Sequence, residues 1–192
     1  MPGSSLWLLP PADHSLNSIL TSLIETTSSH FHSQHLFIPH VTLTSDIPSS
    51  SYSANPQAWL SAIELPTSKE VKVIFGGLES RDVFVQKLFI KVEKAGIADI
   101  GEMARTVVPG FEDSGKARKW AEETYYPHLS LLYHDCPKVA PESISEIASY
   151  ARHAGVSLAE EGDLGGWTGG RVVLVPTDKP IKDWVPIVSR EL

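Results

Sequence analysis

Hydrophobic residues recur along the chain with two different periods, which predicts a mixture of strands and helices. Residues 6–9 are a short, continuous apolar run that ends at two prolines, a pattern typical of a buried strand. From Leu16 to Ile24 the apolar positions follow the spacing of one helical face, and Asp13 precedes them as an expected cap. Asn55 followed by Pro56 predicts the start of a second helix.

The remaining segments continue this mixture. Further strands are expected at residues 36–44, 71–78, 84–92, 129–133, 171–176 and 183–188, and further helices at residues 94–107, 114–124 and 141–153. Residues 162–170 are rich in glycine and predict a hairpin. Because hairpin strands mix with helices and no long linker divides the chain, we expect one domain over residues 1–192, of the α+β class with largely antiparallel sheets.

A pentapeptide that occurs twice is the strongest internal signal, as PHVTL at residues 39–43 and PHLSL at residues 127–131. Each copy begins an apolar strand-like run. Side chains two apart on a strand face the same way, so each histidine shares a face with its hydroxyl partner while the aliphatic residues point into the core. The four polar residues presented in this way are His40, Thr42, His128 and Ser130.

Two such units suit the hydrolysis of a phosphate diester without a metal. The reaction needs a base that takes a proton from water and an acid that protonates the departing oxygen on the opposite side of phosphorus. One neutral and one protonated imidazole meet this need near pH 7. We therefore predict that His40 and His128 are catalytic, in either order of acid and base, and that Thr42 and Ser130 bind the phosphate oxygens. A purely structural duplication is the alternative.

Composition narrows the classes of ligand. The chain has 16 Lys and Arg against 23 Asp and Glu, a net charge of −7 with neutral histidines. This balance argues against binding of long nucleic acid, whereas a small phosphorylated ligand needs only a few local donors. Cys136 is the single cysteine, so no internal disulfide and no zinc site of paired cysteines are expected. Because no apolar run approaches the roughly 20 residues that span a membrane, we expect a soluble, cytoplasmic monomer with a small-molecule substrate, no cofactor and no metal.

The paired His-x-Thr and His-x-Ser elements resemble those of the two-histidine phosphoesterase superfamily. Within it, the sequence is most similar to the cyclic phosphodiesterases of fungi and plants. The similarity lies in the opening Ser5-Leu6-Trp7, in the PHVTLT and PHLSLLY segments, and in the glycines and tryptophan near the carboxyl end. It covers essentially the whole chain.

This resemblance implies a bilobal α+β fold in which two antiparallel sheets flank a central groove and helices lie outside. It also implies metal-independent opening of a cyclic phosphate. Members of this branch act on ADP-ribose 1″,2″-cyclic phosphate, formed downstream of transfer RNA splicing, and open nucleoside 2′,3′-cyclic phosphates to 2′-phosphates. His40, Thr42, His128 and Ser130 match the catalytic positions of the family, and fungal relatives linked to the Golgi make that compartment a second expectation.

Two aromatic residues are candidate contacts to the base or ribose of a nucleotide. Trp167 lies in the glycine-rich segment, which lacks the Gly-Lys-Ser/Thr ending of a P-loop and predicts either a flexible hairpin or base stacking. Tyr133 matches an aromatic residue of the family. On a straight strand from His128 it would face the opposite way, so it reaches the groove only through a bulge or turn. The histidines between residues 30 and 40 match no common metal-ligand spacing and indicate a solvated loop.

Two other functions remain open. An RNA-end phosphodiesterase or a 2′–5′ ligase-like member of the same superfamily would prefer oligonucleotides, which the negative charge disfavours. A module that binds nucleotides without turnover would need the groove but no proton-donating pair. The sequence leaves the preferred base open.

Overall fold

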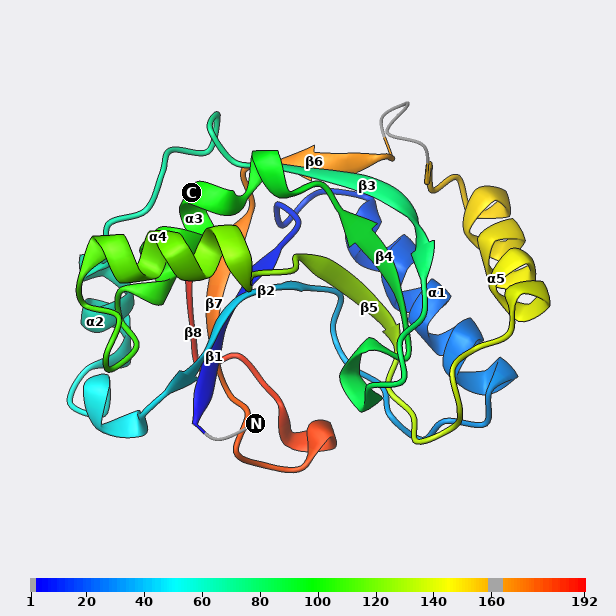
Figure 1. Cartoon of the computed structure of the whole chain (residues 1–192), viewed down its shortest axis with the longest axis horizontal. Helices are drawn as coiled ribbons and strands as arrows, with labels where there is room; N and C mark the ends of the chain where they lie inside the picture. Colours follow the sequence, from blue (N-terminus) through cyan, green and yellow to red (C-terminus); the bar gives the residue numbers. More distant parts are fainter. Residues whose placement is uncertain (1–2, 159–163) are drawn as a thin grey trace.

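The computed structural model describes residues 3–158 and 164–192, whose strands form one curved antiparallel sheet. The order of strands across the sheet is β6-β3-β4-β5-β2-β1-β7-β8. The strands are β1 (Ser4–Leu9), β2 (Val41–Ile47), β3 (Lys72–Glu79), β4 (Leu88–Val92), β5 (His128–Leu132), β6 (Gly166–Thr168), β7 (Arg171–Pro176) and β8 (Val188–Glu191). Figure 1 shows the sheet arching, with the helices around its outside.

The helices flank the sheet in two groups. They are α1 (Leu16–His30), α2 (Pro56–Ala62), α3 (Ala98–Arg105), α4 (Ser114–Glu123) and α5 (Pro141–His153). In Figure 1, α1 and α5 lie on one flank and α2, α3 and α4 on the other. None of the helices within the described residues combines the length and the apolar character needed to cross a membrane.

Helix starts follow local chemistry. The side chain of Asn55 accepts a hydrogen bond from the amide of Ala58 at 3.0 Å, and Pro56 occupies the first position of α2, as predicted. The cap expected at Asp13 is wrong, because α1 follows Ser15 without a capping side chain. This helix also runs to His30, beyond its apolar stripe, since the buried hydroxyl of Thr27 donates to the carbonyl of Leu23 and leaves no unsatisfied polar group there.

Several predicted segments are shorter than expected for identifiable reasons. The strand expected at residues 84–92 begins only at Leu88, because a 3₁₀ turn at Phe84–Gln86 precedes it. The helix expected at residues 94–107 is interrupted near Gly96, where a Cβ would lie 2.0 Å from the carbonyl oxygen of Lys72. The glycine-rich segment, of which residues 162–163 lie outside the described residues, contains β6 paired with β3 and not a flexible hairpin.

The expectation of two separate sheets is corrected at the centre of the molecule. The half β6-β3-β4-β5 and the half β2-β1-β7-β8 join through the pair Val41↔Leu129 of β2 and β5. Each half contributes one copy of the repeated pentapeptide. The two copies therefore lie side by side on neighbouring antiparallel strands.

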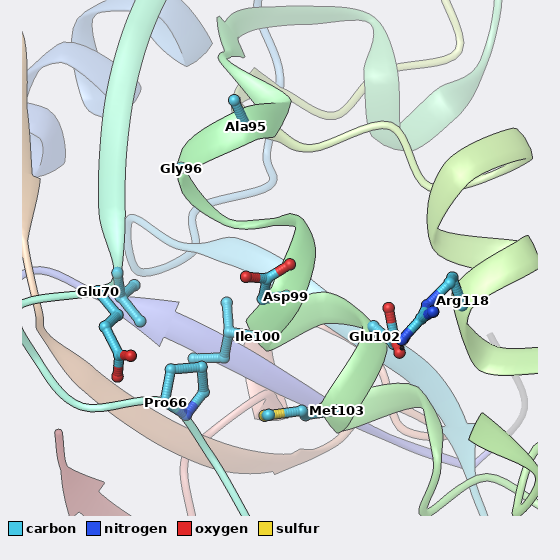
Figure 2. A pocket seen from close by; sticks show the side chains of 10 residues that line it. Pro66, Glu70, Ala95, Gly96, Asp99, Ile100, Glu102, Met103 and Arg118 are labelled. Carbon is cyan, nitrogen blue, oxygen red and sulfur yellow. Dashed lines mark ion pairs between the residues drawn. The ribbon is translucent and has the colours of Figure 1, made fainter. Parts of the chain in front are cut away.

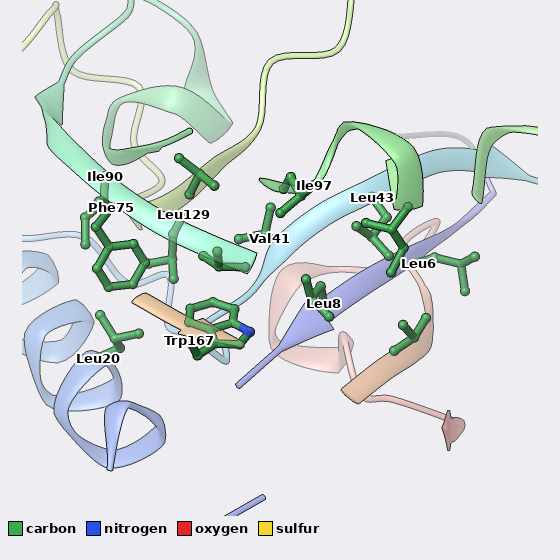
Figure 3. Close-up of a cluster of buried hydrophobic side chains, with 14 of the residues drawn as sticks. Leu6, Leu8, Leu20, Val41, Leu43, Phe75, Ile90, Ile97, Leu129 and Trp167 are labelled. Atoms are coloured by element: carbon green, nitrogen blue, oxygen red, sulfur yellow. The ribbon is translucent and has the colours of Figure 1, made fainter. Parts of the chain in front are cut away.

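Each face of the sheet carries its own cluster of buried hydrophobic side chains. On the outer face, the aliphatic side chains of the pentapeptides pack with the helices in one large cluster that Figure 3 shows in part, including Val41, Leu43, Leu129 and Leu20 of α1. The opposite, inner face carries a smaller cluster of Trp7, Leu9, Val173 and Val175, against which Ile38 and Trp184 pack. Because the strands alternate, the polar residues of the pentapeptides belong to the inner face.

Candidate active site

The strand register brings the two motifs together on the inner face. Val41 pairs with Leu129, so along this antiparallel ladder His40 stands opposite Ser130 and Thr42 opposite His128. The two histidines are thus diagonal neighbours, whose side chains in such a ladder lie about 7–8 Å apart. The charge of His128 acts on the pKa of His40, which agrees with this proximity. The structure brings together all four residues that the pentapeptides predict.

His40 is enclosed. Its side chain is 4% exposed, and its ring stacks on the indole of Trp7 with centroids 3.7 Å apart and an angle of 11° between the planes. Its Nδ1–H donates to the carbonyl of Ile38 at 2.7 Å, since a carbonyl can only accept. In the neutral ring this leaves the lone pair on Nε2. Burial lowers the pKa of His40 from 6.5 to about 4, the hydrogen bond to Ile38 acts in the opposite direction, and the charge of His128 lowers it further.

His128 has the same local hydrogen bond in different surroundings. Its Nδ1–H donates to the carbonyl of Tyr126 at 2.8 Å, again two residues earlier in the chain. The ring is partly exposed and meets the edge of Phe89 at a centroid distance of 5.1 Å. Burial lowers the pKa of His128, the hydrogen bond to Tyr126 raises it, and the positive charge of Arg81 lowers it further. In both imidazoles the hydrogen bond occupies Nδ1 and leaves Nε2 for other partners.

The hydroxyls of Thr42 and Ser130 differ in whether they already form a hydrogen bond. The hydroxyl of Ser130 is buried and donates to the carbonyl of Val85 at 2.8 Å. Donating to a phosphate oxygen requires this hydroxyl to rotate away from Val85. Thr42 is partly exposed, and its hydroxyl forms no hydrogen bond with another group among the described residues. Thr42 is thus already available as a donor, whereas Ser130 exchanges one partner for another.

Tyr133 lies against the inner face because β5 ends before it. The strand stops at Leu132, and the Tyr133 ring stacks on Phe37 with centroids 3.9 Å apart. Its edge meets Trp184 at 6.1 Å, so it belongs to the aromatic surroundings of His40. Tyr133 is only 3% exposed, and burial raises the pKa of its hydroxyl, which stays neutral. With so little exposed surface, Tyr133 borders His40's aromatic surroundings and offers only a small area for contact with a ligand.

The base-stacking role predicted for Trp167 is wrong. Its side chain is 5% exposed and lies in the large cluster of the outer face, as Figure 3 shows. Its ring meets the edge of Phe75 with centroids 5.8 Å apart. A glycine-rich segment suggested mobility, but here the tryptophan anchors β6 in the core instead of facing a ligand.

Two residues near the histidines escaped the sequence reasoning as site contacts. Trp7 was noted only as part of the opening strand, although the alternation of buried Leu6 and Leu8 on the outer face would have placed it inward. Arg81 lies in the connection between the strands expected at residues 71–78 and 84–92. No pattern in the sequence shows that this loop folds back toward His128.

The cavity in Figure 2 is separate from the paired motifs. It measures about 350 Å³ and lies beside α3, with Glu70, Asp99 and Glu102 in its lining and an ion pair of 3.5 Å between Arg118 and Glu102. Three of its four charged lining residues are acidic, which does not suit a phosphate. Within residues 3–158 and 164–192, no group of three or more His, Cys, Asp or Glu side chains is arranged to hold a metal ion.

The central pairing of two His-x-hydroxyl elements is the arrangement expected of a two-histidine phosphoesterase. Comparison with known proteins agrees: residues 1–192 match the family described as "Cyclic phosphodiesterase-like protein". The chain is 54% identical over 193 residues to the 2′,3′-cyclic-nucleotide 3′-phosphodiesterase of Phaeosphaeria nodorum, covering 100% of both chains. It is 40% identical over 213 residues to the protein of that name from Neurospora crassa, again with 100% of both covered. The chain therefore belongs to the cyclic phosphodiesterase-like family and is an enzyme.

Proposed function

We propose that the enzyme hydrolyses nucleoside 2′,3′-cyclic phosphates to 2′-phosphates and opens ADP-ribose 1″,2″-cyclic phosphate, without a metal, by acid–base catalysis between His40 and His128. The strand register supports this proposal, because it makes the two histidines and the two hydroxyl residues neighbours on one face of the sheet. The names of the fungal relatives support the class of substrate and the 3′ bond as the one that breaks.

The reaction balances with two proton transfers. One neutral imidazole accepts a proton from water through Nε2 as the water oxygen forms a bond to phosphorus. The bond between phosphorus and the 3′ oxygen breaks on the opposite side, and that oxygen takes the Nε2 proton of the other, protonated imidazole. The products are a 2′-phosphate and a free 3′-hydroxyl. Thr42 and Ser130 hold the non-bridging oxygens, whose negative charge grows toward the transition state.

Because the pKa values of both histidines are lowered, the bound substrate also influences which imidazole is protonated. The pKa of His40 is about 4 and that of His128 lies below its ordinary value, so both rings of the free enzyme favour the neutral form at pH 7. A bound phosphate anion raises the pKa of the imidazole it contacts. Binding of the substrate thereby helps to supply the proton that the leaving oxygen needs.

Product analysis tests this proposal. The enzyme, treated with a chelator, is incubated with each nucleoside 2′,3′-cyclic phosphate and with ADP-ribose 1″,2″-cyclic phosphate, and phosphorus NMR identifies the isomer that forms. We expect 2′-phosphates from the nucleotides, opening of the ADP-ribose compound, and rates unchanged by the chelator.

Each contrary outcome removes a defined part of the proposal. Formation of 3′-phosphates would reverse the assignment of the leaving oxygen, and loss of activity after chelation would reject the metal-independent scheme. Binding without turnover would mark a nucleotide-binding module. A strong preference for oligonucleotides would favour an RNA-end phosphodiesterase.

A further inference from the structure

The surroundings of His128 contain a positively charged side chain that the proposed chemistry does not use. The guanidinium of Arg81 lies over the ring of Tyr126 at 3.8 Å from the centroid, and 5.8 Å from the centroid of Phe89. Phe89 is also the ring that meets His128. Tyr126 lies beside His128 as well, with ring centroids 6.5 Å apart, so the guanidinium and the imidazole border the same two rings. The charge of Arg81 accordingly acts on the pKa of His128.

The turn that carries Arg81 is held firmly. The Arg81 amide donates to the carbonyl of Gln86 at 3.0 Å, and the guanidinium is 3.4 Å from the side-chain oxygen of the same residue. Lys87, which is 2% exposed, forms an ion pair of 2.7 Å with Asp82 and donates to the carbonyl of Cys136. The same turn supplies the Val85 carbonyl that binds Ser130. Arg81 is therefore presented from a fixed position and not from a loose loop.

The charge of Arg81 is not neutralised by an ion pair. Among the described residues, Arg81 forms none with a carboxylate. The closest acidic group around Tyr126 is Glu79, whose carboxylate accepts the Tyr126 hydroxyl at 2.7 Å. Lys91 pairs with His128 in the β4–β5 ladder and adds a second positive charge to this face. A guanidinium has five donors in a planar fork. Arg81 directs one toward Gln86 and one toward Tyr126, which leaves the others for an anion.

The position of Arg81 indicates which anion it meets. Across the sheet, β2 with Thr42 lies on one side of His128, while Arg81 follows β3 and lies on the other side. The cyclic phosphate is held between the two histidines, so Arg81 reaches a group beyond the ring that is opened. We propose that Arg81, braced by Tyr126, binds a second anionic group of the substrate, a phosphate or diphosphate attached at the 5′ position. This inference rests on the proposed function of the same site.

Paired substrates that differ only by a 5′-phosphate test the inference. Turnover is measured for adenosine 2′,3′-cyclic phosphate with and without that group, in the wild type, Arg81→Gln and Arg81→Lys. We expect Arg81→Gln to raise KM for the 5′-phosphorylated substrate by about 10- to 100-fold, which corresponds to losing hydrogen bonds to a charged group. For the unphosphorylated substrate, KM and kcat change by less than about threefold when each variant is measured at the optimum of its own pH profile. Lysine keeps the charge without the fork and restores part of the loss.

Binding of the product nucleotides provides a second readout that does not depend on turnover. Calorimetry compares adenosine 2′,5′-bisphosphate with adenosine 2′-phosphate, and Arg81→Gln is expected to abolish the preference for the bisphosphate. Arg118→Gln removes the same charge from an exposed position beside the cavity of α3, and it should leave the preference unchanged.

The outcomes separate this inference from the proposed function. Equal losses with both substrates, or no loss with either, would overturn the second anion subsite even if cyclic phosphates are hydrolysed. If the wild type hydrolyses neither substrate but binds the bisphosphate more tightly through Arg81, the subsite stands and the proposed function fails. A lack of preference in wild-type binding and turnover alike would also overturn the subsite.

Discussion

The two copies of the pentapeptide have nearly the same local structure and very different surroundings. In each, the histidine donates through Nδ1 to the carbonyl two residues earlier, and a buried aliphatic residue on either side of the hydroxyl anchors the strand. His40 lies in an aromatic enclosure, stacked on Trp7. His128 is partly exposed and lies near the positive charge of Arg81. The repeat thus sets the orientation of the imidazoles, and their neighbours set the pKa values.

This difference suits a reaction in which the two histidines have opposite tasks. Desolvation dominates at His40 and favours its neutral form. At His128 desolvation is again the largest effect, and the positive charge of Arg81 adds to it. A duplicated motif therefore does not imply duplicated roles. The following predictions separate what the copies share from what distinguishes them.

The largest expected effect tests the part that the copies share. His40→Ala and His128→Ala should each lower kcat by about 10²- to 10⁴-fold, since each removes one proton-transfer group. The double variant should lose far less than the product of the two single losses, because acid and base act as a unit. Steady-state kinetics measures this. Full activity in either single variant would reject the two-histidine mechanism.

Removing the enclosure of His40 tests what distinguishes the copies. Trp7 is 0% exposed, so Trp7→Ala should lower the free energy of unfolding by about 3–5 kcal/mol through the cavity it leaves. Trp184 is only partly buried, and Trp184→Ala serves as the matched control with a smaller loss. Urea denaturation gives both values. Trp7→Phe retains a stacked ring if the alanine variant fails to fold, and equal losses for the two alanine variants would show that the enclosure is not centred on Trp7.

The pH dependence of stability should show the burial of His40 directly. Its folded pKa is about 4 and its ordinary value 6.5, so on acidification the unfolded chain binds a proton before the folded one does. Stability is therefore complete above pH 6.5 and falls between about pH 6.5 and 4, by about 3 kcal/mol at most.

The control for this dependence is a change of the titrating group itself. His40→Asn should flatten the slope, leaving the contribution of His128, whereas His153→Asn, at an exposed position of α5, should not. Urea denaturation at a series of pH values measures these slopes. An unchanged slope in His40→Asn would mean that His40 is not desolvated in solution.

Much of this site could be predicted from the sequence because its signals are local. Alternation within each pentapeptide assigned His40 and Thr42 to one face and Val41 to the other, and the structure agrees. The pairing of β2 with β5 joins segments far apart in the chain, so nothing local distinguished one continuous sheet from two. Trp167 was misplaced for a related reason. Glycines around it predicted exposure, whereas pairing of β6 with β3 buries it.

The surroundings of the histidines were the least predictable part. Whether an imidazole is stacked on an indole or lies beside a guanidinium depends on which strands and turns the fold brings next to it. Trp7 reaches His40 through the β1–β2 pairing, and Arg81 reaches His128 through a turn that Lys87 fixes from within. These contacts influence the pKa values, so the sequence supports the proposal of an acid–base pair without assigning its members.

The smallest expected effect concerns the charge beside His128. A profile of kcat/KM against pH should be bell-shaped, rising through the lower pKa of the coupled pair and falling through the upper one, which lies below 6.5 because both histidines are shifted down. Arg81→Gln removes a positive charge, so the falling limb should move to higher pH by less than about one unit, as expected for a solvent-screened charge. Arg81→Lys should leave it in place. A limb that does not move in Arg81→Gln would show that desolvation alone lowers the pKa of His128, and the two copies would then differ only in how deeply each imidazole is buried.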